Sequence, residues 1–136
     1  MIISHLNYLA VAVSAIAYFM LGAIWYNAKV FGTIWAKGHN IDTTNMDRSG
    51  MGKMMALTFV SCFVIAIVCG YMMTALYSYK CMSGMKLGLL MGVGFSGTTY
   101  FVHCLYTKKP FSVVLIDGGY HVLGIMLCSI IMSVWR

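Results

Sequence analysis

Four long apolar windows constrain this chain more than any other feature of its sequence. They cover approximately residues 6–26, 54–77, 87–106 and 111–135. An α-helix rises about 1.5 Å per residue, so about 20 apolar residues match the roughly 30 Å hydrocarbon core of a bilayer. The windows leave no room for a separate soluble domain. We therefore predict one all-α integral membrane domain over residues 1–136, a bundle of four transmembrane helices.

Composition excludes an ordinary soluble domain and argues against a nucleic-acid-binding protein. Hydrophobic residues make up 61% of the chain and charged residues only 9%, whereas soluble proteins carry roughly 25% charged residues. The formal net charge of +6 comes from basic residues spread over several loops rather than gathered into one binding face. We expect the chain to lie in the lipid bilayer and not to bind nucleic acid.

The distribution of the basic residues predicts an orientation in the membrane. Cytoplasmic loops carry an excess of Lys and Arg, and six such residues lie in or beside the first and third loops, against three on the opposite side. This bias places those two loops in the cytoplasm and both termini outside, in a bacterial inner membrane. The six are Lys29, Lys37, Arg48, Lys53, Lys108 and Lys109, and the three are Lys80, Lys86 and Arg136.

The first loop begins with a short amphipathic segment, residues 28–37. Its apolar residues, from Val30 to Trp35, recur at helical spacing between two flanking lysines. This pattern is typical of a helix that lies along the membrane interface, with its lysines reaching anionic headgroups. The polar remainder of the loop, residues 38–50, predicts a turn and a helix cap. We expect His39 to be a solvated loop residue with no special role.

Small residues recur at every fourth position in the second and third windows. Such rows let helix backbones approach closely, which matters because lipid provides no hydrophobic drive for helices to associate. We expect Gly118 and Gly119 to allow a similar close approach in the last window. Four helices with two such rows favour a homo-oligomer of unspecified subunit number. The rows are Cys62, Ala66, Gly70 and Thr74, and Gly84, Gly88, Gly92 and Ser96.

The last window contains the polar pair Asp117 and His121, one helical turn apart and on one face. Pro110 in a tight third loop makes the third and fourth helices an antiparallel hairpin. Counting from that turn brings His103 level with Asp117, and two threonines level with His121. These side chains predict one polar pocket near mid-membrane, with two aromatic residues at its mouth. The remaining members of the predicted pocket are Thr98, Thr99, Tyr120, Trp25 and Tyr26.

The buried carboxylate leaves several roles open. An ionised carboxylate at the centre of a membrane helix costs roughly 2.5–3.5 kcal/mol. Asp117 therefore has to be protonated, paired with His121 or His103, or exposed to a water-filled cavity. A proton relay, a metal site and a cavity for a lipid or other apolar molecule are three functional readings. The structural alternative is that Asp117 only hydrogen-bonds a neighbouring helix.

Motifs for other chemistry are missing from the sequence. Histidines and carboxylates form no HxxxH or ExxH pair, so we expect no metal and no cofactor. The five cysteines include no CxxC pair, which argues against a zinc ribbon or a disulfide framework. The segment Gly94-Phe-Ser-Gly97 is only a fragment of the hydrolase motif GxSxG. We expect the protein not to be an enzyme.

Three motifs carry a resemblance to a known family. The first is Leu21-Gly-Ala-Ile-Trp-Tyr26, followed by Val30-Phe-Gly and Trp35. The second is Leu115-Ile-Asp-Gly-Gly-Tyr-His121 after a basic–proline turn, and the third is the closing Trp135-Arg136. With these motifs the chain resembles a widespread family of small bacterial membrane proteins, catalogued as domain of unknown function seventeen sixty-one. The resemblance implies four transmembrane helices and no established activity.

The chain departs from the family pattern at two places. That pattern usually has asparagine at the position of Asp117, and an acidic residue in the loop that here contains Lys108 and Lys109. An amide cannot exchange a proton at neutral pH, so the first departure weakens an obligatory carboxylate relay. The resemblance instead implies a hydrogen-bonding role that Asn and Asp share, with Tyr120 and His121 as the more informative pair.

Two functional hypotheses follow from the sequence. The first is an oligomeric channel or transporter for an ion or small solute, with an intramembrane Asp/His pocket. The alternative is a non-transporting scaffold, accessory subunit or lipid-binding protein, whose buried polar residues lock the packing of the helices.

Overall fold

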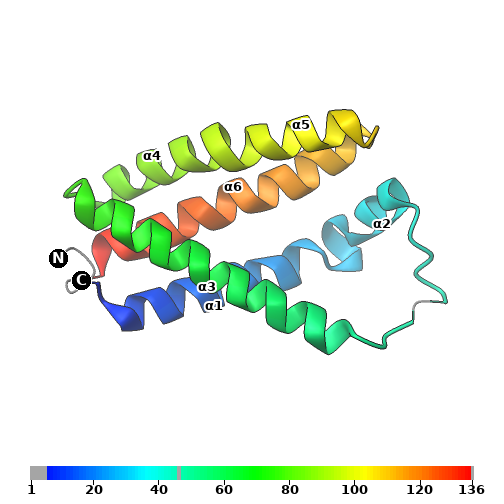
Figure 1. Cartoon of the computed structure of the whole chain (residues 1–136), viewed down its shortest axis with the longest axis horizontal. Coiled ribbons are helices and arrows are strands. Elements are labelled where there is room, and N and C mark those ends of the chain that lie inside the picture. Colours follow the sequence, from blue (N-terminus) through cyan, green and yellow to red (C-terminus); the bar gives the residue numbers. More distant parts are fainter. Residues whose placement is uncertain (1–5, 46, 136) are drawn as a thin grey trace.

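The fold is all-helical throughout the residues that the structure, a computed structural model, describes: 6–45 and 47–135. Three helices, α1 (Tyr8–Trp25), α3 (Met51–Ala75) and α6 (Phe111–Val134), are long and apolar enough to cross a membrane. Figure 1 shows them side by side, with the start of α1 and the end of α6 at the same end of the bundle. The helices expected in the first, second and fourth windows are therefore present.

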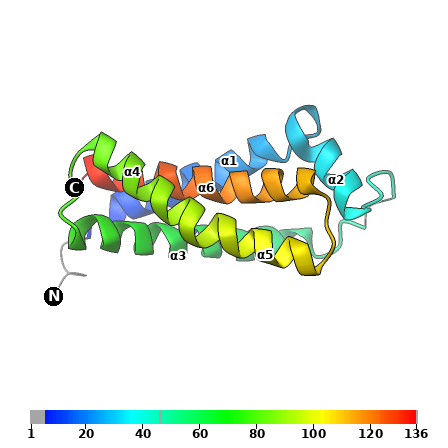
Figure 2. The same cartoon turned by 90° about the horizontal axis from the view of Figure 1, so that it is seen from above.

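The third window forms a helical rod made of three pieces. These are α4 (Cys81–Met91), a π-helical segment η3 (Gly92–Gly97) and α5 (Thr98–Tyr106). The junction residues Gly92 and Thr98 keep right-handed helical dihedrals, so the rod does not break (Figures 1 and 2). Three of the six residues of η3 are glycine, the poorest helix former after proline. Neither α4 nor α5 alone has the length of a membrane span.

The amphipathic part of the first loop is helical, as predicted. A π-helical turn, η2 (Ala28–Gly32), leads into α2 (Thr33–His39), which ends at Asn40 in the left-handed conformation (φ 58°). A Cβ atom at Gly32 would overlap the backbone carbonyl oxygen of Tyr26. Glycine is therefore required at the point where the chain folds back after α1.

The last helix, α6, is the centre of the bundle. It packs against α1, α3 and α4, and the α4–α5 rod lies along its outer side (Figure 1). The core between α1, α3 and α6 is built largely from small and sulfur-containing residues around the buried rings of Tyr120 and Tyr18, and the ring of Tyr18 is fully buried. A Cβ at Gly124 would overlap this ring, so the close contact of α1 with α6 depends on glycine there.

Both rows of small residues are used within the chain. The row on α4 faces α6: a Cβ at Gly88 would lie 2.7 Å from the Cα of Met126, and one at Gly92 would lie 3.0 Å from the Cα of Val122. On α3, Cys62, Ala66 and Gly70 are buried in the bundle. Neither row is left to hold a second subunit, so the argument from these rows for a homo-oligomer is lost.

At Gly118 and Gly119 the described residues show no contact that requires glycine, in contrast to the packing role predicted for them. Apart from its chain neighbours and the backbone of its own helix, no atom of the described residues lies within 4 Å of a Cβ built at Gly118, and a Cβ at Gly119 would make an ordinary 3.5 Å contact with the Trp25 ring. Close approach in α6 instead occurs one to two turns later, at Gly124. Sequence spacing does not reveal which glycine faces a neighbouring ring, because this depends on the rotation of the helix.

Glycine at position 88 is expected to be required for stability. In Gly88→Ala the new methyl group meets the α6 backbone, which cannot move aside, and we expect a loss of about 1–3 kcal/mol from overpacking. Thermal unfolding of the purified protein in detergent measures this loss. Gly94→Ala in the same rod is the control, because a Cβ there would meet no described residue within 4 Å beyond its own helical turn. Equal melting temperatures for the two variants would contradict the close contact of α4 with α6.

Candidate functional site

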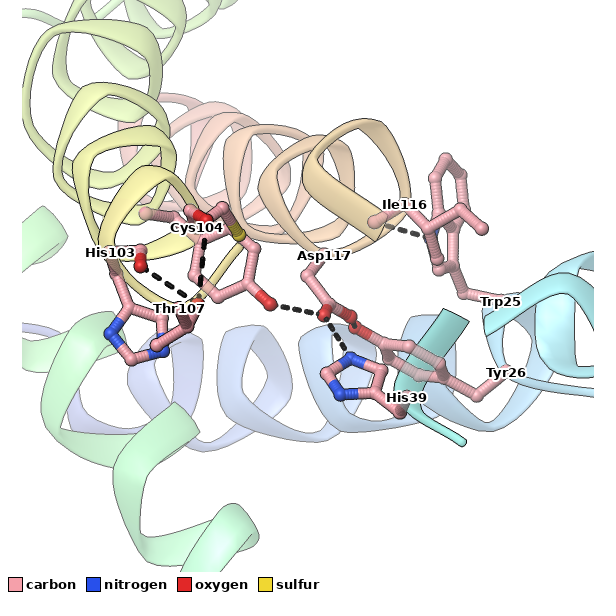
Figure 3. A network of polar contacts seen from close by, with 9 residues as sticks. Trp25, Tyr26, His39, His103, Cys104, Thr107, Ile116 and Asp117 are labelled. Atoms are coloured by element: carbon pink, nitrogen blue, oxygen red, sulfur yellow. Dashed lines mark hydrogen bonds and ion pairs between the residues drawn. The ribbon is translucent and has the colours of Figure 1, made fainter. Parts of the chain in front are cut away.

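Asp117 lies at the centre of a polar cluster to which four helical elements contribute. The hydroxyl of Tyr26 donates to its Oδ1 at 2.6 Å, and the hydroxyl of Tyr100 donates to its Oδ2 at 2.5 Å. Nε2 of His39 lies 3.2 Å from the same Oδ2. Only 7% of Asp117 is exposed. The carboxylate therefore has three donors, and both of its oxygens are engaged (Figure 3).

Aromatic contacts position the donors around the carboxylate. The ring of Tyr26 packs edge-on against Trp35 of α2, with centroids 5.4 Å apart, and Trp35 packs on the His39 ring at 4.8 Å. The neighbouring Trp25 donates its indole N–H to the backbone oxygen of Ile116 at 2.9 Å, as Figure 3 shows. The end of α1 and the short α2 are thus both attached to α6 beside Asp117.

His39 is one of three site residues that the sequence analysis missed, together with Tyr100 and Tyr18. It was expected to be a solvated loop residue, but α2 folds back over α6 and carries the imidazole to Asp117. The preceding Gly38 makes this approach possible: a Cβ there would overlap the side chain of Val113 and lie 3.3 Å from Pro110. A glycine at the end of a short amphipathic helix was the one local signal. The sequence offers no means of choosing the surface on which that helix docks.

The two predicted histidine partners do not contact Asp117. Nδ1 of His121 is 2.7 Å from the hydroxyl of Tyr18, and the His121 ring packs on Tyr120 with centroids 4.9 Å apart. His103 packs against the Tyr100 ring at 5.9 Å and lies apart from Asp117 in Figure 3. The predicted single pocket is therefore divided into two: a closed cluster around Asp117 and a second region around His121.

The second region is a groove between α3 and the rod, with α6 as its floor. Its volume is about 860 Å³, within the range of known ligand pockets, roughly 300–1,000 Å³. Its edges are open to the outside of the bundle, since Val68 is 50% exposed and Phe95 is 75% exposed. It is lined by Val64, Ile65, Val68, Cys69, Met72, Met91, Phe95, Ser96, Thr99, Tyr100, His103, His121 and Ile125.

Most of the predicted pocket residues lie at one of these two places. His121, His103 and Thr99 line the groove, and Tyr26 belongs to the Asp117 cluster. Ser96, predicted as a packing residue, also lines the groove. Thr98 does not line the groove, and its hydroxyl donates to the backbone oxygen of Gly94 at 2.6 Å. Tyr120 is buried between α1 and α6, where its hydroxyl lies 3.4 Å from the carbonyl oxygen of Tyr18.

The Asp117 cluster and the groove between α3 and the rod suit different roles. The Asp117 carboxylate is surrounded by donors from the chain itself, an arrangement that stabilises a fold. The groove has free volume, an apolar side and several polar side chains, an arrangement that suits a bound molecule. Within the described part of the chain, no three His, Cys, Asp or Glu side chains are grouped closely enough to hold a metal ion.

Asp117 is expected to tolerate asparagine and not leucine. Asp117→Leu leaves two tyrosine hydroxyls and His39 without an acceptor, and each buried unpaired donor costs about 1–3 kcal/mol. Asp117→Asn retains a carbonyl oxygen that can accept from two of these donors, and its NH2 group can donate to the remaining tyrosine hydroxyl. Limited proteolysis of the first loop and thermal unfolding in detergent measure the effect: we expect faster cleavage and a lower melting temperature for Leu only. Unchanged cleavage in Asp117→Leu would contradict the attachment of α2 through this residue.

Comparison with known proteins identifies a family and nothing narrower. No curated protein and no solved structure matches the chain. A family model described as "Protein of unknown function (DUF1761)" matches residues 9–133. This match covers nearly the whole chain and agrees with the family expected from its motifs. The chain belongs to this family of proteins of unknown function.

Proposed function

We propose that the chain is a four-span integral membrane protein that binds a small lipid-soluble molecule in the groove between α3 and the rod. The observation that carries this proposal is the groove itself: about 860 Å³ of open volume with an apolar wall on one side and polar side chains on the other. In this proposal the hydrogen bonds of the Asp117 cluster stabilise the packing of the helices. The protein is then a binding protein rather than an enzyme.

The length of the rod supports the fourth span. From Cys81 to Tyr106 it extends about 39 Å at about 1.5 Å per residue, more than the roughly 30 Å needed. An even number of crossings also agrees with the start of α1 and the end of α6 lying at the same end of the bundle (Figure 1). The π-helical turn shortens the rod slightly and keeps its backbone hydrogen bonds internal, as a membrane span requires.

The arrangement of charges supports an orientation. The first and third loops lie together at the end opposite the termini of the bundle (Figure 1), and six of the nine basic residues lie in or beside them. Lys80 and Lys86 belong to the other end, and Arg136 lies outside the described residues. By the excess of basic residues in cytoplasmic loops, the loops are cytoplasmic and both termini are outside, as in a bacterial inner membrane.

Reporter fusions at the C terminus test this topology. Alkaline phosphatase is active only where its disulfides form, outside the cytoplasm, whereas green fluorescent protein attached at the same place is expected to be dark. We therefore expect high phosphatase activity and no fluorescence from the two fusions in a bacterial host. Strong fluorescence with inactive phosphatase would mean either the opposite orientation or an odd number of spans.

Transport through the Asp117 cluster has less support than binding. A proton relay needs a continuous chain of exchangeable groups, but among the described residues no hydrogen bond joins Asp117 to His121 or His103. Three donors from the chain already surround the carboxylate. The cluster therefore suits a structural role, in which its hydrogen bonds stabilise the packing of the helices. The asparagine that the family pattern has at the position of Asp117 agrees with that role.

Filling the groove is expected to abolish binding. Val68→Trp places a large ring in the groove, whereas Val60→Trp places the same ring on a part of α3 outside it; the two valines are 50% and 56% exposed. Native mass spectrometry of the purified proteins counts the lipid-soluble molecules each retains after the detergent is removed. We expect the wild type and Val60→Trp to retain one bound molecule and Val68→Trp to retain none. Equal retention by both variants would contradict a site in the groove.

A further inference from the structure

Tyr18 determines which nitrogen of His121 carries the proton. Its hydroxyl lies 2.7 Å from Nδ1 of His121, and Tyr18 is fully buried. If Nδ1 were the donor, the tyrosine O–H would be buried with no acceptor among the described residues, an arrangement that folded proteins avoid. The tyrosine therefore donates, Nδ1 accepts, and the imidazole has its proton on Nε2.

The Nε2–H group of His121 is free to donate to a molecule in the groove. His121 lines the groove, and no hydrogen bond from its Nε2 is found within residues 6–45 and 47–135. The rod presents further polar groups to the same space. Ser96, Thr99 and His103 follow each other at spacings of three and four residues, which places them on one helical face. Polar groups without a partner are costly in hydrocarbon, so these groups favour a ligand with polar atoms.

The other wall of the groove defines the rest of the ligand. The side chains from α3 are all apolar, from Val64 to Met72. The thirteen described residues that line the groove include no Lys, Arg, Asp or Glu. A carboxylate or phosphate headgroup would therefore have no charged partner here, whereas a neutral acceptor atom would meet the His121 N–H. The open edges of the groove face the surroundings of the bundle, so the ligand enters from the lipid.

We propose that the groove binds a neutral, lipid-soluble carbonyl compound, whose carbonyl oxygen accepts a hydrogen bond from Nε2 of His121 and whose apolar body lies against α3. Tyr18 is a positioning residue, because it holds the proton on the nitrogen that faces the ligand. This inference rests on the proposed function of the groove and adds the chemistry of the ligand's polar end. A quinone and the ester carbonyl of a neutral glyceride share that chemistry.

Matched probes test the role of the carbonyl group. Decylbenzoquinone and decylbenzene have the same apolar tail and differ in the ring oxygens, and dioctanoylglycerol supplies ester carbonyls. Their affinities are measured by titration calorimetry with the full chain in detergent micelles, and partition into the micelle is subtracted with Val68→Trp. We expect at least one carbonyl probe to bind about five- to tenfold more tightly than decylbenzene, the contribution of one hydrogen bond. The tighter of the two carbonyl probes indicates the source of the natural ligand.

Variants of the donor and of its positioning residue separate direct from structural effects. His121→Leu is expected to remove the preference for the carbonyl probe and to leave the affinity for decylbenzene unchanged. His121→Gln retains an N–H donor and is expected to keep part of the preference. Tyr18→Phe no longer holds the proton on Nε2 and is expected to give an intermediate loss. The carbonyl stretching band of the bound probe, shifted to lower frequency by a hydrogen bond, is expected to shift back in His121→Leu.

The outcomes distinguish this inference from the proposed function. Equal binding of decylbenzene and both carbonyl probes, all abolished by Val68→Trp, would overturn the carbonyl inference and leave the groove as a binding site. A preference that persists unchanged in His121→Leu would also overturn it. No saturable binding of any probe, to a wild-type protein that unfolds cooperatively, would overturn both.

Discussion

The burial of one carboxylate in an apolar bundle is the constraint on which the rest of this structure depends. Asp117 is 7% exposed in a helix that packs against all five other α-helices of the described chain, and a buried charge is tolerated only where donors surround it. The donors come from the end of α1, from α2 and from α5. One side chain thus links the end of α1, the first loop and the far end of the rod to α6.

The groove follows from how the rod is attached to α6. Glycines at positions 84, 88 and 92 let α4 lie directly against the backbone of α6, while the rod and α3 diverge toward α5 (Figure 1). The π-helical segment η3 lies in this region, and it contributes Phe95 and Ser96 to the groove. π-Helical turns are frequent at functional sites because they re-aim the side chains of one turn. The polar face of the rod and the apolar face of α3 then enclose one amphipathic space.

Sequence reasoning predicted which residues belong to the site better than it predicted which of them contact each other. It identified Asp117 and His121, which the spacing of four residues places on one face of α6. It also brought His103 and Thr99 to the same region, because the short third loop fixes the hairpin of the rod and α6. It named only His121 and His103 as possible partners of Asp117, whereas the rotation of α5 about its axis directs Tyr100, and not His103, at the carboxylate.

The sequence alone determined that this protein is helical, with helices long and apolar enough to cross a membrane, because the length and polarity of each window are local properties of the chain. It also determined the position of each polar residue along α6, because helical rise is constant. Only the tertiary structure decided that His39 reaches Asp117, that Gly124 rather than Gly118 receives a ring, and that Tyr18 holds His121. These contacts depend on the rotation and crossing of helices, which are set by the packing of many side chains together and not by any one segment.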